Sequence, residues 1–142
     1  MNEPQLSFLE GHHLLTYLEP DEVQIIKNTA LFESHEVDDM VITEGEKALF
    51  LLIVYQGTLA VFVEDFDGEK ELATLAKGDF MGEISIISNQ PASASIKCLS
   101  KVDLIAIPKD VVVSIKNKNT HFCQFLSKTS IARFEENLTK QI

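Results

Sequence analysis

Between residues 31 and 107 the sequence is a series of short apolar or alternating runs, each ended by a turn signal. This pattern constrains the fold more than any other feature. A two-residue period indicates a strand with one buried face, and Gly or Asp-Gly between such runs indicates a tight turn. About eight short strands at this spacing predict an antiparallel jelly roll or barrel. The runs include VITEGE, ALFLLIVYQG, TLAVFVED, KELATLAKG, SASIKCLS and VDLIAIP, with a hairpin turn expected at Asp67-Gly68.

Helical periods flank this β region on both sides. Pro20 and the two acidic residues after it are typical of a first helical turn. After Pro108 the helical period returns, and Thr120 is expected to cap the longer of two C-terminal helices. The fold class is therefore mainly β with flanking helices. We expect one domain over 1–142, with helices at 5–30, an eight-stranded antiparallel jelly-roll barrel at 31–107 and two C-terminal helices at 108–142.

The charge balance excludes some classes of partner. The chain carries 22 acidic and 12 basic residues, a net charge of −10. Nucleic acid and anionic membranes both require clustered basic side chains, so neither is expected as a partner. The longest apolar run, LFLLIVY, is too short to span a bilayer, and the N-terminus lacks the basic and apolar regions of a signal peptide. We expect a cytoplasmic protein.

Catalytic and metal-binding patterns are not evident in the sequence. No His or Cys pair has metal-ligand spacing, and no Ser lies in a G-x-S-x-G context. The sequence therefore predicts neither an enzyme nor a metal or other cofactor.

A candidate anion site lies in the stretch GDFMGEISIISNQPASASIKC, residues 78–98. Gly82 would let the backbone approach a ligand closely. A short helix after Glu83 would aim the N–H groups of Ile84 and Ser85 at an anion. The Glu83 carboxylate can accept a hydrogen bond, as a ribose 2′-hydroxyl would require.

This stretch and the order of elements resemble the cyclic nucleotide-binding domain family over nearly the whole chain. In that family the phosphate-binding cassette reads F-G-E-L-A-L, then a few variable residues, then P-R-A-A-T-V. Here M-G-E-I-S-I and P-A-S-A-S-I stand in the same register, and EGE at 44–46 and YQG at 55–57 also match. The resemblance implies a regulatory domain that binds cAMP or cGMP. It also implies that Ser93 meets the cyclic phosphate, with Ser95 on the same strand face.

The sequence departs from the family at Ala92, where the family carries an arginine that grips the exocyclic phosphate oxygens. A missing bidentate, charge-assisted contact should weaken cyclic nucleotide binding by roughly a hundredfold or more. Lys77 and Lys97 are interpreted as surface charges rather than replacements. Arg133 is the first candidate to compensate, since only a guanidinium reproduces the planar fork.

Two functions remain open from sequence alone. The chain could be a stand-alone sensor that signals to an unknown partner protein through its C-terminal helices. It could instead be a degenerate module that no longer binds cyclic nucleotide and serves as a protein-interaction platform. Glu83 could equally cap the short helix, and the two serines could be ordinary strand residues. The family's transcription factors add a helix-turn-helix after the last helix, which is not seen here, so direct DNA binding is not expected.

The last helix carries a candidate dimer seam. Ile131, Phe134, Leu138 and Gln141 follow heptad spacing. These side chains could pack on the barrel or form a homodimer through residues 120–142.

Overall fold

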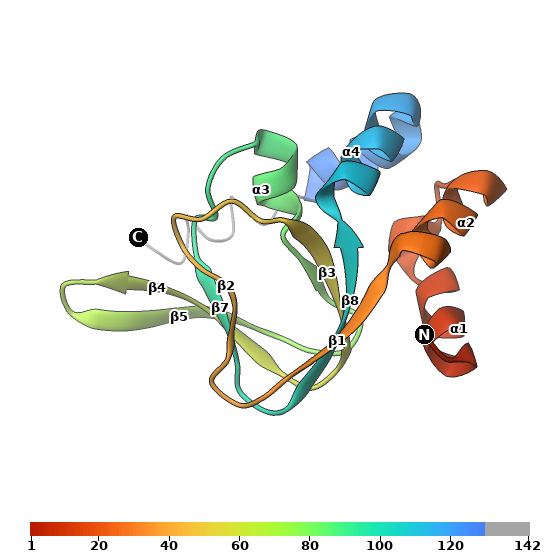
Figure 1. Ribbon diagram of the computed structural model, residues 1–142. Helices are drawn as coiled ribbons and strands as arrows, with labels where there is room; N and C mark the ends of the chain where they lie inside the picture. The colour runs from red at the N-terminus through yellow and green to blue at the C-terminus, as the bar shows by residue number, and fades with distance from the viewer. Residues whose placement is uncertain (130–142) are drawn as a thin grey trace.

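The computed structural model describes residues 1–129, which form two β-sheets flanked by helices (Figure 1). The helices are α1 (Glu3–Glu10), the 3-10 turn η1 (His13–Leu15), α2 (Pro20–Thr29), α3 (Glu83–Ser88) and α4 (Lys109–Lys118), followed by a helical segment over 120–129. The strands are β1 (Leu31–His35), β2 (Met40–Ile42), β3 (Phe50–Gln56), β4 (Leu59–Asp65), β5 (Gly68–Leu75), β6 (Phe80–Met81), β7 (Ser95–Cys98) and β8 (Val102–Pro108).

The eight strands form two four-stranded sheets in the orders β1-β8-β3-β6 and β2-β7-β4-β5. Every strand pair is antiparallel, and successive strands lie in different sheets except for β4 and β5, which form a hairpin in the second sheet. This arrangement confirms the mainly β jelly-roll fold with flanking helices that the strand pattern predicts.

The β4–β5 hairpin projects away from the helices (Figure 1). Its two-residue loop is Phe66 and Asp67, one residue earlier than the Asp67-Gly68 turn expected from sequence. The N–H of Asp67 donates to the side chain of Asp65 (2.8 Å), and Gly68 takes a positive φ of 109°. The carboxylate of Asp65 thus begins the turn, and the glycine completes it at the start of β5.

Two apolar clusters hold the layers together. One lies between the sheets and includes Val54, Leu59, Ile96 and Leu104. The other joins the first sheet to the helices, where Ile53 and its neighbours meet α1, α2 and α4. The central strands β3 and β8 are buried on both faces, which explains their continuous apolar runs.

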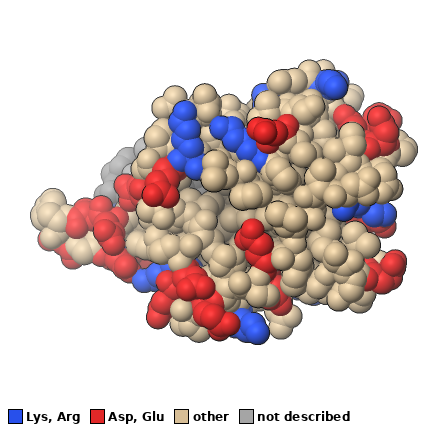
Figure 2. All heavy atoms as spheres, in the orientation of Figure 1, with Lys and Arg blue, Asp and Glu red and all other residues tan. Residues whose placement is uncertain are grey.

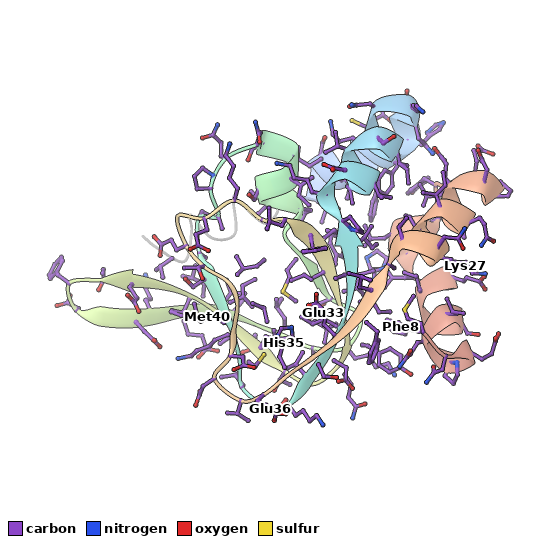
Figure 3. All side chains as sticks on the ribbon, viewed as in Figure 1. Phe8, Lys27, Glu33, His35, Glu36 and Met40 are labelled. Atoms are coloured by element: carbon purple, nitrogen blue, oxygen red, sulfur yellow. The ribbon has the colours of Figure 1, made fainter. Side chains whose placement is uncertain are left out.

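The N-terminal helices are tied together and to the sheet by side chains. Pro20 occupies the first turn of α2 with acidic residues beside it, as predicted. Lys27 of α2 forms an ion pair with Glu10 of α1, and Phe8 meets the ring of Tyr55 edge-on at 5.2 Å (Figure 3). These contacts fix the helices on the outer face of the first sheet.

The C-terminal segment packs on the same side as the N-terminal helices. Phe122 and Leu126 are fully buried, at 1% and 0% exposure. Asn119, rather than the expected Thr120, caps this segment, because its side-chain oxygen accepts from the N–H of Phe122 (3.0 Å). The side-chain nitrogen of Asn119 also donates to the carbonyl oxygen of Tyr17 (2.8 Å), which anchors the helix start. Arg133 and the heptad positions from Ile131 onward lie outside the described residues.

Acidic side chains gather on the projecting hairpin in Figure 2. The exposed acids there include Glu64, Asp65, Asp67 and Glu69. Within residues 1–129, no helix has the length and apolar character needed to cross a bilayer.

Candidate functional site

A pocket of about 300 Å³ opens between α3, β6 and the inner face of the second sheet. Six of the seven expected site residues line it, from two separate segments of the chain. Those residues are Gly82, Glu83, Ile84, Ser85, Ala92 and Ser93. The remaining wall is largely apolar, with Ile42, Ala48, Val61, Ala73, Thr74, Leu75, Asp79, Met81, Ala94 and Ile96.

Gly82 makes the sharp turn that enters α3. It has a left-handed backbone, with φ of +94°, and it is the N-cap residue of the helix. A Cβ at this position would lie 2.6 Å from the carbonyl oxygen of Phe50, well inside van der Waals contact. Only glycine therefore fits both the conformation and the close approach to β3.

The short helix expected after Gly82 is present as α3. Glu83 lies in its first turn, lines the pocket and is only 2% exposed. The backbone N–H groups at the start of any α-helix have no acceptor within the helix, and here they belong to pocket-lining residues that include Ile84 and Ser85. The helix thus places a buried carboxylate and backbone donors on one wall.

The hydroxyl of Ser85 serves the fold. Its Oγ accepts from the N–H of Ala48 (3.0 Å) and donates to the carbonyl oxygen of Gln90 (2.6 Å). These bonds hold α3 against the segment before β3 and fix the loop that follows the helix.

Ala92 is held in place by its backbone on both sides. Its N–H donates to the carbonyl oxygen of Glu46 (2.8 Å), and its carbonyl oxygen accepts from the N–H of Gly45 (2.9 Å). The methyl group of Ala92 thus forms part of the wall at a fixed position, with the exposed Ser93 beside it.

Ser95 differs from the expectation. It lies at the start of β7 and is absent from the pocket wall, and its Oγ accepts from the N–H of Glu44 (2.9 Å). Ser93 precedes β7, so the two serines do not form the continuous strand face expected from sequence. Ser95 instead ties β7 to the turn after β2.

A family model described as the cyclic nucleotide-binding domain matches residues 32–119 of this sequence, well over half of the chain. The chain belongs to the cyclic nucleotide-binding domain family. The cGMP-dependent protein kinase of Plasmodium berghei (strain Anka) is 34% identical over 89 residues, or 63% of this chain and 10% of the kinase. The chain therefore spans a small part of that relative.

Solved structures share the fold at lower identity. The regulatory subunit of a cAMP-independent protein kinase A from Trypanosoma brucei aligns with a TM-score of 0.78 and 22% identity, over 96% of this chain and 51% of that one. A triple mutant of that protein, in which one substitution introduces an arginine, was solved with cAMP in the A site. The corresponding subunit from Trypanosoma cruzi, solved with guanosine, aligns with a TM-score of 0.68 and 23% identity, over 75% of this chain and 39% of that one.

The described pocket wall contains acidic side chains but no basic one. Among the described lining residues none is Lys, Arg or His, and two are acidic. The ammonium of Lys77 lies 5.4 Å from the ring centre of Phe8 and 5.3 Å from that of Tyr55. Lys97 forms an ion pair with Glu69 at 2.8 Å. Both lysines therefore contact residues that do not line the pocket, which agrees with their interpretation as surface charges.

Asp79 is a wall residue that the sequence reasoning missed. Its Oδ2 accepts from the N–H of Ala76 (2.9 Å), and its own N–H donates to the carbonyl oxygen of Ala76 (2.9 Å). The Gly78-Asp79 pair after a strand signals a turn of this kind, but only the fold brings that turn to the pocket.

Proposed function

We propose that this domain is a regulatory sensor, not an enzyme, in which a ligand beside Glu83 alters the packing of the C-terminal helices and a partner protein reads the change. The observation that carries this proposal is a contact between two aromatic rings, one beside the pocket and one in the C-terminal helical segment. Met81, Gly82 and Glu83 line the pocket, and Phe80 immediately precedes them. The Phe80 ring lies 6.5 Å from that of Phe125, centre to centre.

The N-terminal segment meets the same aromatic cluster. The ring of His13 lies 5.6 Å from Phe80 and 5.9 Å from Phe125. A ligand that moves β6 or the start of α3 would therefore press on an interface shared by both helical ends of the chain. Packed aromatic groups of this kind transmit small displacements because they have few alternative arrangements.

The ligand that this pocket serves need not be a cyclic nucleotide. The methyl of Ala92 cannot supply the phosphate fork, and we expect cAMP and cGMP to bind with Kd above about ten micromolar. The trypanosomal relatives support this idea, since one is described as cAMP-independent and another was solved with guanosine.

Calorimetric titration of the chain with cAMP, cGMP and cyclic dinucleotides tests the ligand half of the proposal. Hydrogen–deuterium exchange of residues 109–129 with and without millimolar cAMP tests whether ligand binding alters the packing of the C-terminal helices. We expect weak binding and a changed exchange rate in that helical region, both lost in Glu83→Ala. Nanomolar binding would show that a replacement cation exists, with Arg133 the first candidate, and Arg133→Ala should then abolish it.

A second candidate function is the interaction platform, which the acidic wall and Ala92 favour. On this alternative the fold is retained, the pocket holds no small ligand and a partner docks on the surface. A folded chain that binds neither cyclic nucleotides nor related small molecules would support it over the sensor.

A further inference from the structure

The tip of the β4–β5 hairpin exposes a phenylalanine to solvent. Phe66 is 98% exposed, whereas the other large apolar side chains on the described surface are between 39% and 69% exposed. The hairpin projects away from the helices (Figure 1), and the described part of the chain leaves the ring uncovered. The domain therefore presents one aromatic side chain at the end of a projecting hairpin.

The local fold does not need this side chain. The turn is formed by the carboxylate of Asp65, which accepts from the N–H of Asp67 (2.8 Å), and by Gly68 with its positive φ of 109°. Such turn positions are usually filled by Gly, Pro, Asn, Asp or Ser. An aromatic ring left in water also forgoes the free energy that its burial would supply. A contact outside this chain accounts for a phenylalanine at the tip better than the turn does.

The hairpin holds the ring in a defined place. β4 and β5 are paired from Leu59 opposite Leu75 at the base to Asp65 opposite Gly68 at the tip. Leu59 and Leu75 both belong to the apolar cluster between the sheets, which anchors the base. Because the strands are already ordered, a partner that binds the tip incurs little cost for ordering them.

The charge around the ring is mainly negative, as Figure 2 shows for the hairpin. Lys70 is the only basic residue between positions 59 and 75, and the acidic residues there are Glu64, Asp65, Asp67, Glu69 and Glu71. Glu69 is paired with Lys97, whereas Glu64 and Asp67 form no ion pair within residues 1–129. This field attracts a positively charged surface and repels a negative one.

These features define the chemistry of the partner. At protein interfaces an aromatic anchor is typically buried in an apolar centre, with polar and charged groups at the rim. A second copy of this chain is disfavoured, because each copy carries a net charge of −10. Nucleic acid and anionic membranes are repelled for the same reason. A protein with an apolar patch bordered by basic side chains suits both the ring and the acids.

We infer that the β4–β5 hairpin docks on a partner protein, which buries Phe66 in an apolar patch bordered by Lys or Arg side chains that face Glu64 and Asp67. The hairpin projects away from α4 and from the helical segment after it (Figure 1), so this surface is separate from the helices in the proposed sensor function. The inference does not require a ligand in the pocket.

A synthetic amphipathic peptide with a leucine face bordered by lysines is a probe of this chemistry. Fluorescence anisotropy of the labelled peptide with the whole chain should show binding that weakens as salt is added, because salt screens exposed charges. The same peptide with glutamate in place of each lysine should not bind. This comparison tests the charge requirement without altering the protein.

Phe66→Ser should weaken binding of the lysine peptide by about tenfold or more, because the ring is no longer buried in the complex. Leu49→Ser is the matched control, since it removes an apolar side chain that is 69% exposed on the segment before β3, and it should leave binding unchanged. Circular dichroism with thermal unfolding shows that both variants are folded.

The double variant Glu64→Gln with Asp67→Asn should weaken binding by about threefold and reduce its salt dependence, because two rim charges are removed. Glu3→Gln with Asp21→Asn is the control. It removes the same two charges from exposed positions in the first turns of α1 and α2 and should change neither quantity.

A photoreactive benzoylphenylalanine in place of Phe66, in cells that produce the chain, tests for a partner in the cell. We expect a protein that cross-links from this position but not from position 49. The purified partner should bind the unlabelled chain, and Phe66→Ser should weaken that binding by about tenfold or more.

The contrary outcomes are equally distinct. Peptide binding that Phe66→Ser leaves unchanged, or that Leu49→Ser weakens as much, overturns the inference. So does the absence of a cross-link specific to position 66, or a cross-link to a second copy, a lipid or a nucleic acid. Each of these results leaves the sensor function standing, because that function is tested through the pocket and residues 109–129.

Discussion

The Nε2 atom of His12 lies 2.7 Å from the carbonyl oxygen of Gly78, and this contact joins the N-terminal segment to the turn that reaches the pocket. The other ring nitrogen, Nδ1, accepts from the N–H of Leu14 (3.1 Å). The ring must therefore be neutral, with its proton on Nε2, for both bonds to form. Asp79 follows Gly78 directly and lines the pocket, so a buried neutral histidine supports one end of the wall.

The neutral state of His12 predicts that acid destabilises the domain. Burial lowers the pKa of His12 below its ordinary value of 6.5, although the bond to Gly78 and nearby Asp79 partly oppose this effect. The unfolded chain then binds a proton that the folded chain does not. Stability is therefore complete above about pH 6.5 and falls as the pH drops from there towards the folded pKa.

Urea unfolding at about pH 7.5 and about pH 5.5 measures this loss, for which one group contributes at most about 1.4 kcal/mol per pH unit. His12→Gln should be less stable at neutral pH but lose this component of the pH dependence. His35→Gln is the control, since His35 lies elsewhere, beside Glu33 and Asp39, and should retain the component due to His12 (Figure 3). If His12→Gln keeps the full pH dependence of the wild-type stability, the assignment of this dependence to His12 is wrong.

Gly82→Ala should destabilise the domain more than Gly45→Ala. Both glycines have a left-handed backbone, with φ of +94° and +89°, so each alanine incurs a strain of about 1–2 kcal/mol. At Gly45 a Cβ meets nothing within 4 Å, whereas at Gly82 it would lie 2.6 Å from the Phe50 carbonyl oxygen. We expect Gly82→Ala to cost at least about 1 kcal/mol more, by chemical denaturation. If the two variants lose the same free energy of unfolding, the backbone of β3 at Phe50 can shift to accept the added Cβ at little cost.

The strand pattern and the cassette residues could be predicted because each depends on local signals. Alternating runs and turns define strands, and Gly82 followed by Glu83 signals a tight turn into a helix. The fold and the position of α3 follow directly from those signals. The place of Ala92 in the pocket wall is implied instead by the resemblance to the family's cassette, whose register includes this position.

The missed features depend on partners far away in the sequence. The hydroxyl of Ser95 accepts a hydrogen bond from the N–H of Glu44, 51 positions earlier, and the two-residue period of a strand does not predict such a bond. Asn119 rather than Thr120 caps the last described helical segment, since Asn119 also binds the carbonyl oxygen of Tyr17, 102 positions earlier. Asp79 reaches the pocket only because β5 and β6 bring its turn there.

The heptad positions beyond the described residues predict a homodimer at micromolar concentration. Phe134 is central in the apolar series, so Phe134→Glu would bury a charge in the seam and should yield a monomer. Thr139→Glu adds the same charge at the b position after Leu138, which faces away from the predicted seam, and should leave the mass unchanged. Light scattering distinguishes the two states. A wild-type monomer at high concentration, or an unchanged mass for Phe134→Glu, would reject the dimer.

Ala92→Arg should create tight cyclic nucleotide binding. The backbone of Ala92 is fixed by Gly45 and Glu46, so a side chain there starts from the pocket wall. A guanidinium at this position can supply the planar fork to a phosphate. We expect a gain of about 2–3 kcal/mol, or about thirty- to a hundredfold and more in the Kd for cAMP.

Two further variants show whether the gain comes from that contact. Ala92→Lys adds the charge without the fork and should gain less than the arginine. Adding Glu83→Ala to Ala92→Arg should remove the gain, because the ribose hydroxyl loses its acceptor. Calorimetry gives the affinities, and circular dichroism with thermal unfolding shows that each variant is folded. If a folded Ala92→Arg chain binds no cyclic nucleotide, the missing arginine is not the sole defect. The site has then lost the shape of a nucleotide pocket, and the interaction platform becomes the better account of this domain.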